Sequence, residues 1–139
     1  MSRYELHIRS LFFDENGSGE KMETRTEAAF SEEKEGYFLS YADEENGLPK
    51  TDLFIKKGTP CVVKMQNAQS ELLFSVGRTY KTLYRISGVG ELDFTVTTQR
   101  AEAELSSAGG SLRLDYEAVI GGARRRTVMR LTLTRKEAT

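Results

Sequence analysis

The sequence has very few of the residues that form disulfides, metal sites and histidine-dependent catalytic groups. It contains one cysteine, Cys61, one histidine, His7, and no tryptophan. A single cysteine excludes an intrachain disulfide and is compatible with a reducing compartment. A structural zinc site requires about four cysteine or histidine ligands. The sequence therefore predicts no zinc site, and no other pattern in it indicates a metal or a cofactor.

Long apolar runs and an excess of one charge are also missing. The chain has 21 acidic and 20 basic residues, so its net charge is -1, and the molecule as a whole has no attraction to nucleic acid or anionic membranes. No window approaches the roughly eighteen apolar residues of a membrane-spanning helix, and the charged N-terminal segment does not resemble a signal peptide. We expect a cytoplasmic protein with no membrane partner, for which nucleic acid is a poor candidate.

What the sequence does contain is an alternation of apolar and polar residues along nearly its whole length. The alternation has no exception in residues 112–117, which read Leu-Arg-Leu-Asp-Tyr-Glu. Successive side chains of a β-strand point to opposite faces, so this pattern is typical of half-buried strands. About ten such stretches, separated by turn residues, predict an all-β protein. The length of 139 residues is usual for one domain, and we assign residues 1–139 to a single domain.

Three local features refine the strand assignment. Residues 19–35 contain many good helix formers, but their apolar residues do not recur at helical spacing, so we predict a strand over about Lys21–Ser31. Asn46-Gly47 predicts a hairpin turn. Beyond Thr98 the apolar residues change phase, which a one-residue β-bulge near Gln99 or Arg100 would explain.

Short links between strands favour hairpins and therefore an antiparallel sheet. Closing such a sheet removes the long unpaired edges that recruit other chains. We predict a single antiparallel up-and-down barrel of eight to ten strands, with a two-sheet sandwich as the alternative. The absence of a Cys-Trp-Cys pattern argues against an immunoglobulin-type sandwich.

An ordered set of short motifs resembles a known family. The motifs are the runs at residues 37–41, 50–51, 74–77, 90–92 and 110–116. Together they resemble the YwiB-like bacterial proteins, a family of unknown function. The resemblance implies a calycin-like (lipocalin-like) barrel in a bacterial cytosol. It implies no activity and no binding residues.

Tyrosines supply the strongest candidate site. Five of them share the phase of the aliphatic residues in their strands and should point into the lumen: Tyr37, Tyr41, Tyr80, Tyr84 and Tyr116. Buried hydroxyl groups require hydrogen-bond partners, so they predict a shared network, bound water or a ligand. Arg78 lies at a strand end in the inward phase, where it could contact an anionic group of a ligand. We predict that the lumen binds one small amphipathic molecule.

Arg124, Arg125 and Arg126 form the concentrated basic cluster of the chain. This cluster supports an alternative function, in which the outer sheet or the arginine-rich C-terminal hairpin engages protein or RNA. The simpler interpretation is a solvated segment that discourages edge pairing.

Candidate catalytic groups are weak. A Cys61–His7 pair would supply a nucleophile and a base, but a lone cysteine in an apolar strand is usually a small core residue. The acidic groups at 14–15 and 43–45 lie beside turn residues, where carboxylates are simply solvated. We assign no catalytic residue, and the sequence favours a non-enzymatic protein.

Overall fold

The computed structural model describes residues 3–43, 48–86 and 88–136, and these residues form ten β-strands. The strands are β1 (Arg3–Phe13), β2 (Gly19–Glu32), β3 (Gly36–Asp43), β4 (Leu48–Lys56), β5 (Val62–Gln66), β6 (Glu71–Ser75), β7 (Thr79–Ile86), β8 (Gly90–Ser106), β9 (Gly109–Ile120) and β10 (Ala123–Lys136). The all-β prediction is confirmed. The turn predicted at Asn46-Gly47 lies outside the described residues.

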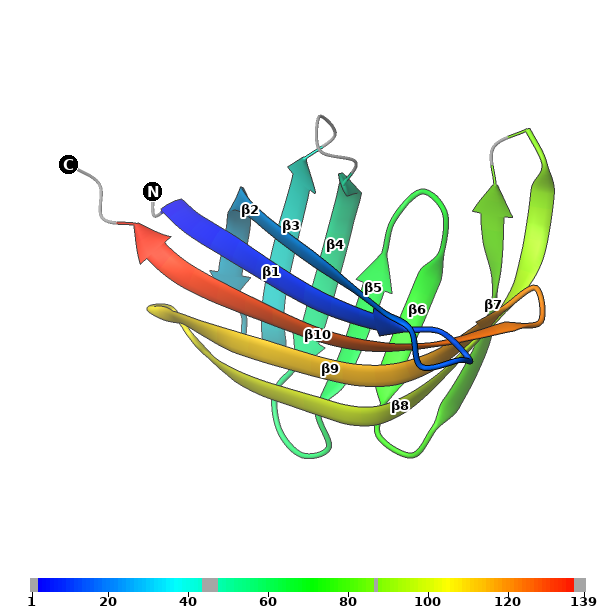
Figure 1. The fold of residues 1–139 in the computed structure, drawn as a ribbon. Coiled ribbons are helices and arrows are strands. Elements are labelled where there is room, and N and C mark those ends of the chain that lie inside the picture. The colour runs from blue at the N-terminus through cyan, green and yellow to red at the C-terminus, as the bar shows by residue number, and fades with distance from the viewer. Residues whose placement is uncertain (1–2, 44–47, 87, 137–139) are drawn as a thin grey trace.

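All ten strands belong to one antiparallel sheet with the order β6-β5-β4-β3-β2-β1-β10-β9-β8-β7. Strands that follow one another in the chain are neighbours, apart from β6 and β7. The first and last strands pair from Arg3 with Lys136 to Phe13 with Arg126. Residues 19–28 pair with β1 throughout, so a strand and not a helix forms here. The sheet curves into a nearly closed barrel (Figure 1), as predicted.

The barrel closes incompletely between β6 and β7, the two ends of the strand order. At one end of this seam the Gly77 amide donates to the Thr98 carbonyl at 3.0 Å, and Val76 forms an isolated bridge with Thr98. At the other end the Arg85 amide donates to the Gln69 carbonyl at 2.9 Å. Backbone contacts therefore link the residues after β6 to β8 and the β5–β6 loop to β7, without a continuous ladder between β6 and β7.

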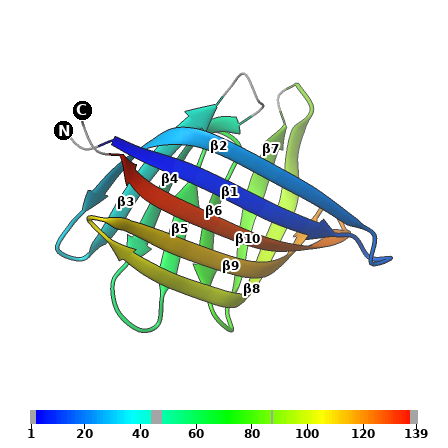
Figure 2. The ribbon, with the colours of Figure 1, turned by 60° about the vertical axis from the view of Figure 1, so that its left-hand side comes forward.

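The two ends of the barrel are distinguished by their turns. We call the end of the barrel at which β1, β5 and β9 finish the upper end, which lies toward the right and top in Figures 1 and 2. The opposite end, at which β2, β4, β6 and β8 finish and β1 begins, is the lower end and lies toward the left and bottom in the same views. This arrangement follows directly from hairpin connections between neighbouring strands.

The inward-facing side chains form one hydrophobic cluster to which most strands contribute, with Leu6, Leu53, Val63, Phe74, Val96 and Leu114 fully buried. The predicted change of phase in β8 is confirmed, because the register with β9 shifts between Thr98 and Arg100. The extra residue lets both Thr98 and Ala101 point into the core. The periodic sequence pattern thus continues across a bend in the strand.

Candidate functional site

Two of the predicted lumen tyrosines, Tyr41 on β3 and Tyr116 on β9, lie buried in the upper half of the barrel. Tyr41 forms a side-chain hydrogen bond with Thr51, and Tyr116 forms one with Thr127. Burial raises the pKa of Tyr41 to about 12, and the neighbouring Tyr116 adds to the increase. Burial also raises the pKa of Tyr116. Both phenols are therefore neutral hydrogen-bonding groups at physiological pH.

A third buried hydroxyl, that of Thr98, lies beside this group. Thr98 pairs with Tyr116 in the register of β8 and β9, and side chains that are directly opposite share one face of the sheet. Its Oγ1 is buried and has no hydrogen-bond partner among the described residues. A buried hydroxyl without a partner costs about 1–3 kcal/mol. The lumen beside Tyr116 therefore has unused hydrogen-bonding capacity.

Arg125 provides positive charge at the upper end. Its position in β10 has the phase of Thr127 and Leu131, which are buried on the inward face. The guanidinium carbon lies 3.7 Å from the centroid of the Phe12 ring, a cation–π contact. Its charge also slightly opposes the raised pKa of Tyr116. Arg125 thus lies over the inward face, close to the buried hydroxyl groups.

The other two arginines of the cluster lie on the outer face and are paired. Arg126 binds Asp115 with two bonds, Nε to Oδ1 at 3.1 Å and Nη2 to Oδ2 at 2.8 Å. Arg124 Nε lies 3.2 Å from Glu117 Oε1. Two of the three adjacent charges are therefore matched by carboxylates of β9, which leaves a weaker basic surface than the sequence alone indicates.

Apolar inward-facing side chains near Arg125 are incompletely buried. Met22 on β2 is 41% exposed, although it lies opposite the buried Ser10 in the register. Met129, which also lies opposite Ser10, packs only partly buried against the core. Phe12 is half-buried. These side chains and Arg125 together make the upper end amphipathic.

Tyr37 lies in a different place from Tyr41 and Tyr116. Its hydroxyl donates to the Leu105 carbonyl at 2.7 Å, and its ring stacks on Phe30 with the centroids 5.8 Å apart. Tyr4, which was not among the candidate site residues, donates in the same way to the Ser107 carbonyl at 2.8 Å. These two tyrosines tie β1 and β3 to the β8–β9 hairpin and close the lower end.

The remaining candidates lie along the seam. The Tyr84 hydroxyl donates to Gln69 Oε1 at 3.1 Å, and Tyr80 is half-buried opposite Val96. Arg78 is exposed in the turn after β6, where its carbonyl accepts a hydrogen bond from the Thr98 amide at 3.3 Å. The structure therefore brings Tyr41 and Tyr116 together, whereas Tyr37 lies at the lower end and Tyr80, Tyr84 and Arg78 lie along the seam.

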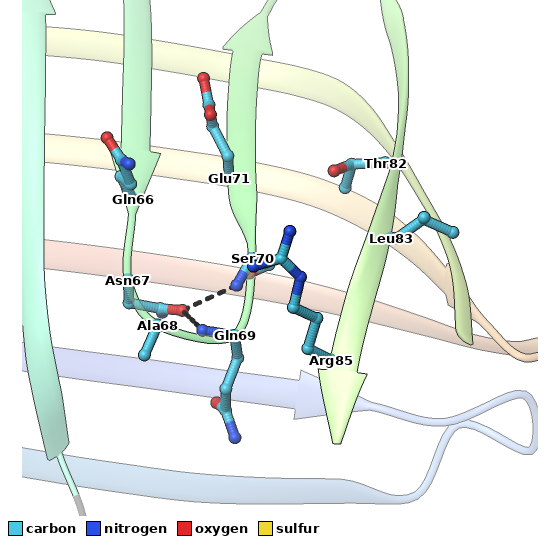
Figure 3. A pocket seen from close by; sticks show the side chains of 9 residues that line it. All are labelled: Gln66, Asn67, Ala68, Gln69, Ser70, Glu71, Thr82, Leu83 and Arg85. Carbon is cyan, nitrogen blue, oxygen red and sulfur yellow. Dashed lines mark hydrogen bonds between the residues drawn. The ribbon is translucent and has the colours of Figure 1, made fainter. Parts of the chain in front are cut away.

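The seam also contains a hollow of about 430 Å³ (Figure 3). The loop between β5 and β6 supplies much of its polar wall, and Thr82, Leu83 and Arg85 of β7 lie across from it. Asn67 Oδ1 accepts hydrogen bonds from the amides of Gln69 and Ser70 at 2.9 and 3.0 Å. The loop is thus held in shape by its own asparagine.

Groups for metal-dependent or nucleophilic chemistry do not gather in the described part of the chain. No cluster of three or more histidine, cysteine, aspartate or glutamate residues occurs there. His7 pairs with Glu23 on the outer face, whereas Cys61 lines a small hollow at the lower end with Lys57 and Leu105. Burial raises the pKa of the Cys61 thiol, which reduces the fraction of the reactive thiolate at neutral pH.

No helix in the described residues is long and apolar enough to cross a membrane.

Sequence reasoning missed the inward position of Arg125 and its contact with Phe12. A signal was present, since Arg125, Thr127 and Met129 share one phase, as do Ser10 and Phe12. The run of three arginines conceals this phase, because a charge cluster normally indicates a solvated segment. The strand register is what separates the middle arginine from its neighbours.

Comparison with known families identifies the chain. The model of a domain of unknown function, DUF1934, matches residues 6–132. The chain belongs to this family. None of the curated proteins matches the sequence.

A solved structure supports the fold of this DUF1934 protein. The crystal structure of the ywiB protein from Bacillus subtilis matches it with a TM-score of 0.77 and 22% sequence identity, over 98% of this chain and 93% of that chain. The predicted resemblance to the YwiB-like family is thus confirmed, as is the antiparallel barrel. The calycin-like classification stays a prediction.

Proposed function

We propose that this DUF1934 protein binds one small amphipathic anion in the upper end of its lumen, in the bacterial cytoplasm. The observation that supports this most strongly is the position of Arg125 over the inward-facing Phe12. Among the described residues Arg125 has no ion-pair partner, whereas its neighbours Arg124 and Arg126 do. A cation held beside apolar side chains suits a ligand with an acidic head and an apolar body.

The surrounding residues suggest how the ligand is oriented. The apolar body would contact Phe12, Met22 and Met129, which are incompletely buried on the inward face. A carboxylate or phosphate would accept hydrogen bonds from the Arg125 guanidinium. Deeper in the lumen, the unpartnered Thr98 hydroxyl would bind a polar atom of the ligand or an ordered water.

The interior of the barrel around this site is well packed, which limits the size of the ligand. Leu114, Val96 and Phe74 are completely buried, and Phe74 contacts Tyr116 with ring centroids 4.8 Å apart. An eight-stranded barrel has space for its own side chains or for one small ligand. We therefore propose a ligand that occupies the upper end rather than the length of the lumen.

Native mass spectrometry of protein purified gently from its own host tests this function. The expected result is a stoichiometric adduct, and the same sample after denaturation identifies the released molecule. Titration with dodecanoate as a probe should then show binding. The Arg125→Gln variant should bind dodecanoate about tenfold more weakly, because it loses a hydrogen bond to a charged group. Arg124→Gln is the matched control and should leave the affinity unchanged. Bare protein in repeated preparations, with no dodecanoate binding, would contradict the proposal.

A further inference from the structure

Three arginines lie side by side on the outer face of the neighbouring strands β1, β10 and β9 (Figures 1 and 2). Arg9 on β1 is opposite Arg130 on β10, and Arg130 is opposite Arg113 on β9. All three are exposed. The residues that adjoin them in the chain, such as Ile8 and Leu131, are buried in the core, so the arginines point outward. We call these three residues the arginine row.

Carboxylates compensate the charge of the arginine row only in part. At one end Glu23 is opposite Arg9, and its Oε1 lies 3.8 Å from the arginine Nε. At the other end Glu102 is opposite Arg113, but its Oε1 lies 3.5 Å from Nε of Arg100 on its own strand. No described residue forms an ion pair with Arg113 or with the central arginine of the row. Like charges that are directly opposite destabilise a strand pair, so the row costs stability as it stands.

Elsewhere on the same face, the arginines of β10 are matched by carboxylates of β9. Arg126 binds Asp115 with two hydrogen bonds, and Arg124 lies 3.2 Å from Glu117. A carboxylate at the next outward position of β9 would extend this pattern, but Arg113 occupies that position. The arginine row is therefore an exception to the charge pairing of this face, and an anion from outside the chain would neutralise it.

The outward residues on both sides of the arginine row supply further groups for a ligand. On one side Thr132 and Ser111 are directly opposite each other and provide two hydroxyl donors. On the other side Leu11 is opposite Val128, and Leu11 is 42% exposed. Hydroxyl and guanidinium groups both donate hydrogen bonds to phosphate oxygens. The apolar pair could contact an organic group, so the arrangement suits an organic phosphate.

The dimensions of the arginine row favour a small ligand with two adjacent phosphoryl groups. Neighbouring strands lie about 4.8 Å apart, so three strands span about 10 Å. One phosphoryl group can bind two guanidinium groups, whereas a diphosphate has enough oxygens for three. RNA would need a longer basic track and aromatic side chains for its bases to stack on. Glu23 and Glu102 end the basic surface on either side, and the row and its two neighbouring rows contain no phenylalanine or tyrosine.

We propose that the arginine row binds the diphosphate group of a small organic molecule. Ser111 and Thr132 would donate hydrogen bonds to its oxygens, and Leu11 and Val128 would contact its organic part. This inference does not depend on the lumen site, because the arginine row lies on the outer face and shares no residue with that site. Isothermal titration calorimetry with inorganic pyrophosphate as the probe tests it, with circular dichroism to show that each variant is folded.

The decisive variants remove the two arginines without an ion-pair partner. Arg113→Gln and Arg130→Gln should each weaken pyrophosphate binding about tenfold, because each variant loses hydrogen bonds to a charged group. Without ligand, both variants should unfold at a higher temperature than the wild type, because the repulsion between neighbouring arginines is relieved. A merely structural role would lower that temperature. Orthophosphate should bind the wild type more weakly than pyrophosphate, because it reaches fewer guanidinium groups.

Arg85→Gln, which replaces an exposed arginine on β7, is the matched control and should leave the affinity for pyrophosphate unchanged. Arg125→Gln should also leave it unchanged, so failure of this proposal is distinguishable from failure of the lumen site. A wild-type protein that does not bind pyrophosphate would overturn the proposal, as would unchanged binding by Arg113→Gln and Arg130→Gln. An oligouridylate that displaces pyrophosphate and binds more tightly would also overturn it, because the surface would then bind RNA.

Discussion

The two ends of the barrel use the same residue type for different purposes. At the lower end, Tyr4 and Tyr37 donate their hydroxyl groups to backbone carbonyls of the β8–β9 hairpin. At the upper end, Tyr41 and Tyr116 form hydrogen bonds with threonine side chains inside the lumen. Backbone contacts fasten one end, whereas side-chain contacts leave the other adaptable. Under the proposed function, the lower end serves stability and the upper end binds the ligand.

The largest expected contrast comes from one glycine in each of two hairpins, the β8–β9 and the β9–β10 hairpin. Gly110 at the lower end has φ +135°, and a Cβ there would collide with the Glu104 carbonyl, whereas Gly122 at the upper end has φ +89° and open space. Gly110→Ala should lower the free energy of unfolding by about 3 kcal/mol, and Gly122→Ala by about 1 kcal/mol. Urea denaturation measures both. Equal losses of stability would show that the two hairpins tolerate a side chain at these positions equally well.

Alkaline pH should destabilise the upper end. The pKa of Tyr41 is raised by burial from 10.0 to about 12 in the folded state, so the folded protein holds the phenolic proton to higher pH than the unfolded chain. The resulting contribution of Tyr41 to the free energy of unfolding is roughly 2–3 kcal/mol. It is complete below pH 10 and is lost as the pH rises to about 12.

Urea denaturation between pH 8 and pH 11 measures this effect. Tyr41→Phe should flatten the dependence, because phenylalanine has no proton to lose. A slope that persists unchanged in this variant would assign the alkaline loss to other groups.

The tyrosine contacts of the lower end should have a moderate effect. Tyr37→Phe removes the hydrogen bond to the Leu105 carbonyl and should lower the free energy of unfolding by about 1 kcal/mol. The affinity of the upper end for dodecanoate should stay the same. A change in affinity without a change in stability would reverse the roles assigned to the two ends.

The smallest contrast separates the adjacent arginines. Arg126→Gln leaves the buried Asp115 carboxylate without its two-bond partner and should cost about 1 kcal/mol of stability. Arg125→Gln removes only the contact with Phe12 and should cost about 0.5 kcal/mol. Thermal unfolding of the two variants compares them. The opposite ranking would show that Arg125 is the structural residue of the pair.

Much of the fold was predictable because strand structure is encoded locally. The alternation in residues 112–117, the strand over residues 21–31 and the bulge near Gln99 all depend on the period of side-chain direction. The closure of the sheet was predictable in outline from the need to protect its edges. The incomplete seam was not, because it depends on how β6 and β7 meet across the barrel.

The candidate site was predictable only in part. The phase of Tyr41 and Tyr116 indicates that both point inward, but phase does not say which inward residues meet. Tyr37 has the same phase and reaches the backbone of β8 instead. The distance of each residue from the ends of the barrel decides this, and that distance depends on strand tilt and register.

By itself the sequence determined that the chain forms antiparallel strands, which residues face the core and where the phase changes, because each of these depends on neighbours in the chain. Only the tertiary structure decided that Arg125 turns toward Phe12 while Arg124 and Arg126 bind β9. It also decided that Tyr37 reaches the Leu105 carbonyl while Tyr41 forms a hydrogen bond with Thr51. These features require strands far apart in sequence to be placed side by side, and no local pattern specifies that placement.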